Sequence, residues 1–254
     1  MGYVLVTPQK QLIVIDGGHA EDAEPLLSLL AERAEDARPR VSLWIITHPH
    51  LDHYGALREI ASKEALRERV TVEELVYCFP ESFRDLAGRP TCVRANAHME
   101  EIRKAWNANV HTPSEDETRE LDGILLTYWS IPSDTTDIHN PNSLSLIFSL
   151  QGSQKTVMIT GDACPVSLRK CVERCGSKLK SDILQMPHHG LCDTGYDSFY
   201  RAVAADTLLI PISRAGDLAM HSDIYKEAAL INQAAELAAG TRYPAYQGIV
   251  SMTI

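Results

Sequence analysis

The segment that most constrains the fold is the run of residues 41–47 (VSLWIIT), which leads directly into the sequence HPHLDHYG. The run has the length of one strand and is almost wholly apolar, which is typical of a strand buried on both faces of a sheet. Strands of this kind belong to α/β folds, in which helices cover the sheet. A short segment with three histidines and one aspartate must therefore follow a buried strand.

The residue types in this segment are those of a metal site. Alternate residues of an extended chain point the same way, so His48 and His50 can converge on one ion. Asp52 and His53, on the following turn, can reach a second ion. Imidazole nitrogens and carboxylate oxygens suit zinc, with manganese and iron as alternatives where several ligands are oxygens. The pattern predicts a site for two divalent ions.

Hydrophobic periodicity predicts strand pairs and crossover helices in both halves of the chain. We expect strands at 3–7, 12–15, 41–47, 71–79, 123–131, 143–150, 156–160, 182–186, 207–211 and 248–254, and helices at 22–36, 56–65, 94–108, 164–175, 196–204 and 224–239. The histidine-rich segment then lies on the loop between strand 41–47 and helix 56–65. No linker or repeat interrupts the pattern, which favours a single domain over residues 1–254, with a sheet-on-sheet core and helices outside.

Charge and composition restrict the partners. The formal net charge is −10 and lysine and arginine form no dense run, so a small substrate is favoured over long nucleic acid. No apolar run approaches the roughly 20 residues that span a bilayer, and no export signal is visible at the N-terminus. The six cysteines lack CxxC pairs, which suits reduced thiols. We therefore expect a cytoplasmic protein without a membrane partner.

The histidine-rich segment resembles the signature His-x-His-x-Asp-His of the metallo-β-lactamase superfamily, which also follows an apolar strand. The resemblance implies a four-layer αββα sandwich of the metallo-β-lactamase type and a binuclear metal site, most simply of zinc. It extends over nearly the whole chain, with the further motifs in the expected order. The superfamily has an acid at the end of an early strand, and Ile15-Asp16-Gly17-Gly18 matches it. Asp16 would fix the orientation of a metal ligand without binding the ion itself.

Two more motifs of the superfamily imply further ligands. Ile138-His139-Asn140-Pro141-Asn142-Ser143-Leu144 agrees with Gly-His-Thr-Pro-Gly-Ser-Leu at His, Pro, Ser and Leu, and departs from it at both asparagines. His139 would be the third ligand of the first ion. Thr160-Gly161-Asp162 ends a strand with the Gly-Asp whose carboxylate bridges both metals in the superfamily.

The last motif is Met186-Pro187-His188-His189-Gly190, where the superfamily commonly has Pro-Gly-His-Gly. His189 takes the ligand position and His188 replaces a glycine, although the reverse register is an alternative. The paired form resembles the branch that contains the nuclease-like domain of DNA-uptake channels and the phosphorylcholine esterases. His188 is therefore expected to contact substrate or donate a proton. His221 is a candidate substrate contact, with an exposed place beside a helix cap as the alternative.

The resemblance implies a metal-dependent hydrolase. Two ions lower the pKa of a bridging water, so a metal-bridging hydroxide would be the nucleophile, with Asp52 and His188 as the catalytic side chains. Zinc β-lactamases usually have cysteine or serine at the position of Asp162, which disfavours a lactam. The paired histidines favour a small phosphoester or phosphodiester.

Several alternatives stay open. The site could serve a thioester hydrolase of the glyoxalase II kind or a lactam hydrolase. A non-catalytic, metal-stabilised binding module is a second alternative. Diiron members of the superfamily that reduce oxygen or nitric oxide carry an added flavin domain, of which the sequence shows no sign. Residues 79–122 carry no readable motif and are expected to shape the roof of the pocket.

Overall fold

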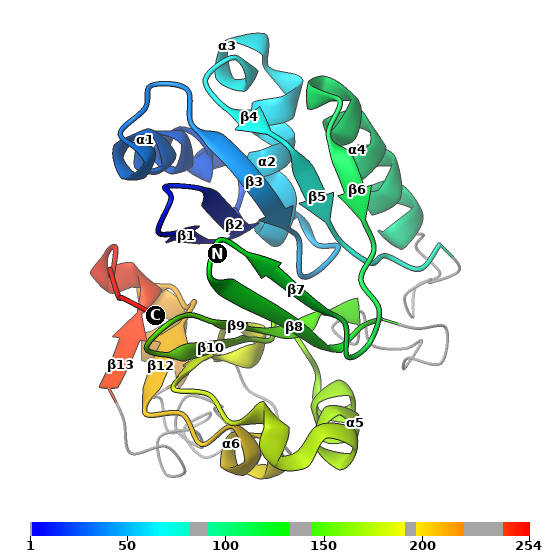
Figure 1. Ribbon diagram of the computed structural model, residues 1–254, viewed down its shortest axis with the longest axis vertical. Coiled ribbons are helices and arrows are strands. Elements are labelled where there is room, and N and C mark those ends of the chain that lie inside the picture. Colours follow the sequence, from blue (N-terminus) through cyan, green and yellow to red (C-terminus); the bar gives the residue numbers. More distant parts are fainter. Residues whose placement is uncertain (1, 82–90, 133–143, 191–196, 221–240) are drawn as a thin grey trace. The chain divides into compact units, whose positions relative to one another are not determined.

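The computed structural model describes residues 2–81, 91–132, 144–190, 197–220 and 241–254 (Figure 1). The chain forms two compact units. Unit 1 consists of Met1–Ser114 and Pro132–Leu144, and unit 2 of Glu115–Ile131 and Ser145–Ile254. Each unit is thus assembled from two stretches of sequence. The single domain over residues 1–254 stays a prediction.

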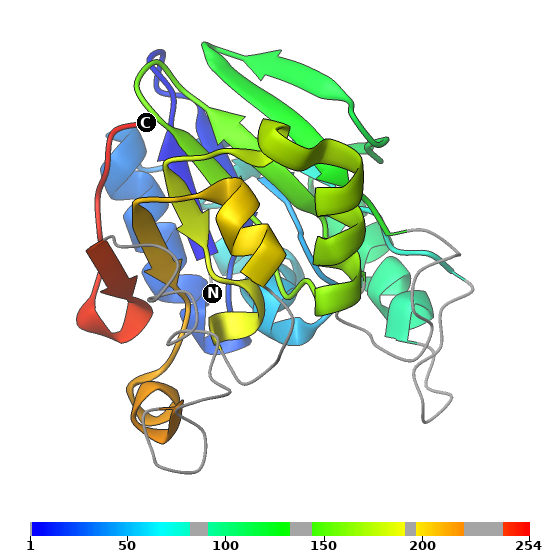
Figure 2. The ribbon, with the colours of Figure 1, turned by 90° about the horizontal axis from the view of Figure 1, so that it is seen from below.

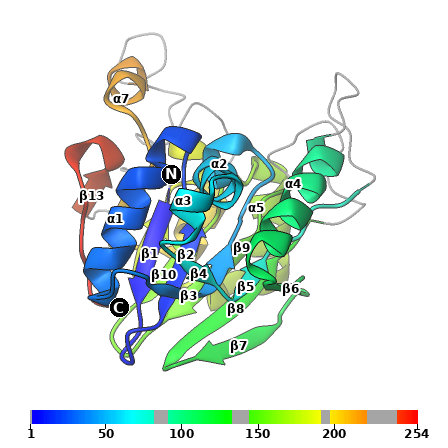
Figure 3. The same ribbon diagram turned by 90° about the horizontal axis from the view of Figure 1, so that it is seen from above.

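Unit 1 is built on a six-stranded sheet with the order β1-β2-β3-β5-β6, in which β4 also pairs with β3. β1 and β2 form the predicted antiparallel hairpin, whereas β2, β3, β5 and β6 run parallel. The helices α1, α2 and α4 lie over this sheet (Figure 3). The bounds are β1 Gly2–Val6, β2 Leu12–Asp16, η1 Ala20–Asp22, α1 Ala23–Ala34, β3 Arg40–Ile45, α2 Leu51–Ser62, α3 Glu64–Arg67, β4 Thr71–Val72, β5 Glu74–Val76, α4 Thr91–Trp106 and β6 Asn109–His111.

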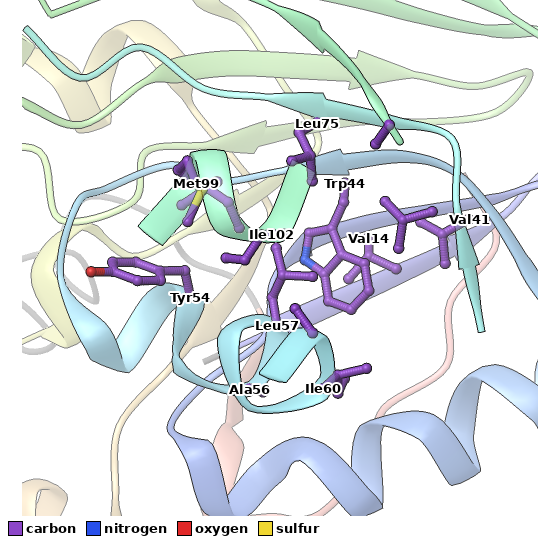
Figure 4. Packing of buried hydrophobic residues seen from close by; sticks show 14 of the residues in the cluster. Val14, Val41, Trp44, Tyr54, Ala56, Leu57, Ile60, Leu75, Met99 and Ile102 are labelled. Carbon is purple, nitrogen blue, oxygen red and sulfur yellow. The ribbon is translucent and has the colours of Figure 1, made fainter. Parts of the chain in front are cut away.

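The core of unit 1 lies between the parallel strands and these helices. Trp44 of β3 is fully buried and packs with Leu57 and Ile60 of α2 and with Met99 and Ile102 of α4 (Figure 4). The helical residues recur every three or four positions, so each helix turns one apolar stripe toward the sheet. The buried apolar strand predicted at 41–47 is confirmed, although β3 itself ends at Ile45.

Unit 2 is built on a seven-stranded sheet with the order β13-β12-β11-β10-β9-β8-β7. The strands β7 to β10 are antiparallel to their neighbours, and β10 to β13 are parallel. Helices α5 and α6, yellow-green and yellow in Figure 2, pack their buried residues with those of this sheet. The bounds are β7 Thr118–Leu121, β8 Ile124–Ser130, β9 Ile147–Gln151, β10 Thr156–Ile159, α5 Pro165–Cys175, η3 Gly176–Leu179, β11 Ile183–Gln185, η4 Pro187–Gly190, α6 Asp197–Val203, β12 Thr207–Ile210, α7 Arg214–Met220, β13 Thr241–Pro244 and η5 Ala245–Gln247.

The mixed α/β class with two sheets is confirmed, but several element boundaries were wrong. The helix predicted at 56–65 begins at Leu51, so the histidine-rich segment is only half loop. The strand predicted at 71–79 is two short strands, β4 and β5, separated at Glu73, and the second of them ends at Val76. The acidic stretch before residue 123 contains the strand β7, which lies at the edge of the sheet and pairs through its backbone with β8.

The last predicted elements also need correction. Residues 248–254 form no strand, and Ile249 and Val250 are exposed. The sheet of unit 2 instead ends with β13, which is parallel to β12. The helix predicted at 224–239 lies outside the described residues.

The structure bears on the membrane and cysteine predictions as well. Among the described residues, no helix is long and apolar enough to cross a membrane. The five described cysteines form no disulfide with one another, and Cys192 lies outside that part of the chain. Burial raises the pKa of Cys92 to about 12 and also raises that of Cys171. These thiols stay protonated near neutral pH and act as small apolar side chains.

Truncation of Leu57 tests the core of unit 1. Leu57 is 0% exposed, so Leu57→Ala leaves a cavity between α2 and the sheet. We expect the free energy of unfolding to fall by about 2–5 kcal/mol, measured by urea denaturation. The control is Val93→Ala on α4, where the side chain is 46% exposed and the expected change is within about 0.5 kcal/mol. Equal effects of the two substitutions would contradict this core.

Candidate metal centre

Asp16 organises the candidate metal-binding residues of unit 1, its half-site, which are His48, His50, Asp52 and His53. Its side chain is fully buried, and its backbone has a positive φ of 56°, which turns the chain at the end of β2. The carboxylate accepts hydrogen bonds from the backbone N–H of Thr47 at 2.8 Å and from the Thr47 hydroxyl at 2.8 Å. The carbonyl oxygen of Asp16 accepts a third bond from the indole Nε1 of Trp44 at 2.8 Å. These bonds fasten the end of β2 to the end of β3.

The same carboxylate fixes the ring of His53. Nδ1 of His53 lies 2.9 Å from Oδ2 of Asp16 and 3.2 Å from the hydroxyl of Thr47. A carboxylate only accepts, so Nδ1 carries the proton and Nε2 of the neutral ring carries the lone pair. Nε2 lies 3.8 Å from Oδ2 of Asp52. The first turn of α2 therefore presents an imidazole lone pair and a carboxylate side by side.

His48 and His50 form the other part of this half-site. Nε2 of His48 lies 2.8 Å from Nδ1 of His50, and the two rings meet edge to face with centroids 4.1 Å apart. His48 is buried, and its ring centroid lies 5.1 Å from that of His53. The rings of these two alternate residues of the extended segment thus lie side by side, and their convergence on one ion stays a prediction.

A glycine allows α2 to begin so close to the preceding loop. A Cβ on Gly55 would meet the backbone nitrogen of Ala20 at 3.0 Å and the carbonyl oxygen of Gly18 at 3.1 Å. The same carbonyl oxygen accepts the N–H of Ala56 at 3.1 Å. A larger residue at position 55 would push the first turn of α2, with Asp52 and His53, away from the loop after β2.

The half-site of unit 2 lies where parallel strands end. Asp162 follows β10, is 3% exposed, and its N–H donates to Oγ of Ser145 at 3.0 Å. His189 follows β11, and its Nε2 lies 3.5 Å from Oδ1 of Asp162. Nδ1 of His189 lies 2.8 Å from the carbonyl oxygen of Pro211, after β12, and must therefore donate to it. The lone pair on Nε2 then faces Asp162.

The neighbouring His188 is held differently. Its backbone N–H donates to the carbonyl oxygen of Gly161 at 3.2 Å, and its φ of 47° is left-handed, as are those of His189 and Gly190. The two imidazole centroids lie 6.3 Å apart, so the rings take separate places. Nδ1 of His188 is buried without a hydrogen-bond partner among the described residues. Of the two registers, the one with His189 beside Asp162 agrees with this geometry.

The chemistry and spacing of these groups fit metal ions. Ligands about 2.0–2.1 Å from a tetrahedral zinc lie roughly 3.4 Å from one another. The facing atoms of Asp52 and His53 and of Asp162 and His189 are 3.8 and 3.5 Å apart, near this separation, whereas the 2.8 Å between His48 and His50 is a hydrogen-bond distance. The described residues thus include His and Asp groups that could hold a metal ion.

Two of the predicted site residues, His139 and His221, lie outside the described residues. The contributions of Thr47, which bonds Asp16 and lies beside His53, and of Pro211, whose carbonyl holds His189, had not been predicted. Tyr54, which follows His53 on α2, has a partner on α4. The Tyr54 hydroxyl lies 3.0 Å from Nδ1 of His98 on α4, and burial raises the Tyr54 pKa to about 12, so the phenol donates this bond at neutral pH. The apolar run that ends in Thr47 could have signalled its role, whereas a backbone carbonyl such as that of Pro211 leaves no trace in the sequence.

The comparison with protein families agrees with this geometry. A family model described as the metallo-beta-lactamase superfamily matches residues 3–214. The chain belongs to the metallo-β-lactamase superfamily. No curated protein matches the sequence. The two sheets with their helices accord with this fold, and the resemblance seen in the sequence motifs is confirmed.

Solved structures show the same fold at low sequence identity. YhfI from Bacillus subtilis, a metallo-beta-lactamase fold protein, has a TM-score of 0.55 and 14% identity, with 98% of this chain and 90% of YhfI covered. Tm1679, a metal-dependent hydrolase of the superfamily, has a TM-score of 0.51 and 13% identity, with coverages of 95% and 89%. CmlA, a diiron beta-hydroxylase from Streptomyces venezuelae, has a TM-score of 0.51 and 11% identity, with 92% of this chain covered. This chain spans 49% of the length of CmlA.

Asp16→Asn tests the network of unit 1. The amide places N–H donors where Thr47 and His53 already donate, so the three bonds to Asp16 cannot all be kept. We expect the free energy of unfolding to fall by about 1–3 kcal/mol and metal affinity to fall by about 10- to 100-fold, measured by urea denaturation and by competition with a chelating dye.

The matched control is Asp36→Asn, which changes an exposed carboxylate that accepts one backbone bond, from Arg38. This control should leave both quantities almost unchanged. An Asp16→Asn protein as stable and as avid for metal as the control would show that the buried carboxylate does not hold His53.

Proposed function

We propose that the chain binds two divalent metal ions, most simply zinc, and that the protein is a metal-dependent hydrolase of a small phosphoester or phosphodiester. The ligands would be His48, His50, Asp52, His53, His139, Asp162 and His189. The superfamily membership and the donor set of the described residues support this proposal.

The observation that carries the proposal is the same in both units. In each, one ring nitrogen is fixed by an acceptor, Asp16 for His53 and the Pro211 carbonyl for His189. The second nitrogen then turns a lone pair toward a carboxylate oxygen, 3.8 and 3.5 Å away. Two acceptors that face each other repel unless a cation lies between them, and these distances exceed the roughly 2.7–2.9 Å of a charge-assisted hydrogen bond. A metal ion would bind both the imidazole nitrogen and the carboxylate oxygen. A hydrogen bond from the other ring nitrogen to an acceptor is the usual support of a metal-binding histidine.

The metal would supply Lewis acidity, which activates water near neutral pH and stabilises negative charge on the substrate oxygens. The residues of the chain hold the metal-binding side chains in place. Asp16 and the Pro211 carbonyl fix the two imidazoles, and the first turn of α2 fixes the carboxylate of Asp52. Asp52 can accept a proton or a hydrogen bond from the attacking water.

His188 is proposed to protonate the leaving group. Its ring lies apart from that of His189, and its buried Nδ1 makes no hydrogen bond with the part of the chain that is described. A proton on this ring can pass to the leaving-group oxygen as the ester bond breaks. His221 stays a candidate contact for the substrate.

Three features favour a small phosphate ester as the substrate. Asp162 stands where zinc β-lactamases usually have cysteine or serine, and the paired histidines resemble those of the branch with the nuclease-like domain of DNA-uptake channels and the phosphorylcholine esterases. The net charge of −10 disfavours a long polyanion. The fold alone does not select hydrolysis, because CmlA, with the same fold, is a diiron beta-hydroxylase. Oxygen consumption by the iron-loaded protein, without hydrolysis, would favour a redox role instead.

Asp162→Ala tests the metal centre directly. We expect about two metal ions per chain in the unsubstituted protein, by mass spectrometry, and hydrolysis of bis(p-nitrophenyl) phosphate. Asp162→Ala should lose at least one ion and more than ~100-fold of the activity, because it removes a ligand and not only a supporting group. The control is Asp206→Ala, an exposed aspartate of the same unit, which should retain both.

The outcomes separate the alternatives. One ion or none in the unsubstituted chain would contradict the binuclear centre. Two ions without phosphodiester hydrolysis would keep the centre and direct the substrate search to thioesters and lactams. No turnover across that panel would favour a binding module.

Substitution of each paired histidine by glutamine tests their separate roles. His189→Gln should lose about one metal ion per chain. His188→Gln should retain both and lose about 10²- to 10⁴-fold in kcat, the usual contribution of a general acid. The loss should be greater for an alkyl than for a p-nitrophenyl leaving group, because the poorer leaving group needs the proton more. Equal loss of metal in both variants would contradict this division of roles.

A further inference from the structure

We infer that Gln185 is a positioning residue for the metal centre, whose side-chain amide sets the Asp162 loop against the His188–His189 loop. The inference rests on the proposed function, because it concerns the ligands of that site. Gln185 is the last residue of β11 and is 0% exposed. A buried amide needs partners for both its oxygen and its nitrogen, and here all of them come from these two loops.

The amide oxygen of Gln185 holds the loop that follows β10. Oε1 accepts the backbone N–H of Thr160 at 2.9 Å and that of Gly161 at 2.8 Å. It also lies 3.2 Å from the hydroxyl of Thr160, which donates to the carbonyl oxygen of Gln185 itself at 2.9 Å. Asp162 is the next residue along the chain. The direction in which the chain leaves β10 is therefore set by one side chain of the neighbouring strand.

The amide nitrogen joins that loop to the second one. Nε2 donates to the carbonyl oxygens of Gly161 at 3.0 Å and of Met186 at 2.5 Å. The carbonyl of Gly161 also accepts the N–H of His188. Gln185 thus contacts the backbone just before Asp162 and the backbone just before the His188–His189 pair.

The sheet explains why a side chain is needed at this place. The parallel pairing of β10 with β11 runs to Met158 and Leu184 and then stops. Beyond it, the peptide groups of Thr160 and Gly161 lack partners in the strand ladder, and Gln185 supplies them. The two backbones that Gln185 bonds lead to Asp162 and to His189, whose Oδ1 and Nε2 lie 3.5 Å apart.

The test measures zinc binding to the whole chain without reference to turnover. Gln185→Met keeps the length of the side chain and removes every hydrogen bond of the amide. We expect one of the two zinc equivalents to bind about 10- to 100-fold more weakly, by competition with a chelating dye. The visible absorption of the cobalt-loaded protein should also change, because it reports the arrangement of the ligands. Circular dichroism checks that the variant is folded.

A second variant and a control make the result specific. Gln185→Glu keeps one acceptor oxygen but, when ionised, places its second oxygen beside the carbonyl oxygens of Gly161 and Met186, which repel it. This variant should therefore weaken zinc binding, and it tests the inference even if Gln185→Met does not fold. Ser149→Ala removes the acceptor of the Trp129 indole, a part-buried hydrogen bond of the same unit that touches neither loop, and should leave zinc binding unchanged. Zinc affinities and cobalt absorption of both Gln185 variants equal to those of this control would overturn the inference. An unsubstituted chain that binds no zinc would contradict the proposed function itself.

Discussion

The hydrogen bonding of the buried Asp16 carboxylate is the interaction on which the rest of unit 1 depends. An ionised carboxylate with no exposure to water is very costly unless donors surround it, and Thr47 and His53 supply three. Those donors come from the loop after β3 and from the first turn of α2, so the charge is satisfied only when both segments are in register with β2. The indole of Trp44, bonded to the Asp16 carbonyl, joins this polar network to the apolar core. The orientation of the His53 ring is thereby tied to the folding of the unit.

Unit 2 reaches a similar result without a buried charge in the supporting role. There the neutral amide of Gln185 bonds backbone groups of two adjacent loops, and the Pro211 carbonyl fixes His189. The difference follows from the topology. In unit 1 the groups to be bonded are all donors, the Nδ1–H of His53 and the N–H and hydroxyl of Thr47, so a carboxylate with several lone pairs suits them. In unit 2 the groups beyond the end of the parallel ladder are both N–H groups and carbonyls, so an amide, which donates and accepts, suits them.

The sequence predicted the class of fold better than it predicted the boundaries of the elements. The histidine-rich segment was found because several histidines follow an apolar run, and the Gly161-Asp162 turn because it matches a motif of the superfamily at the end of a strand. The start of α2 was missed because Leu51 to Tyr54 carry no distinctive helix signal, and the helix is fixed instead by the approach of Gly55 to the backbone of Gly18 and Ala20. The false strand at 248–254 was predicted from apolar residues that prove exposed, whereas β13 contains Arg242 and ends in Pro244. Gln185 could not be found, because its partners are peptide groups of any residue type.

The backbone of the His188–His189 loop gives a further reason to assign His188 a chemical role. Three successive residues there have positive φ, and only Gly190 adopts such a conformation at no steric cost. A non-glycine residue in the left-handed region costs of the order of 1 kcal/mol or more. The superfamily motif that this loop resembles has glycine at the position of His188, where the strain would vanish. An imidazole at such a strained position, with its Nδ1 buried, is more easily explained by the use of its side chain than by packing.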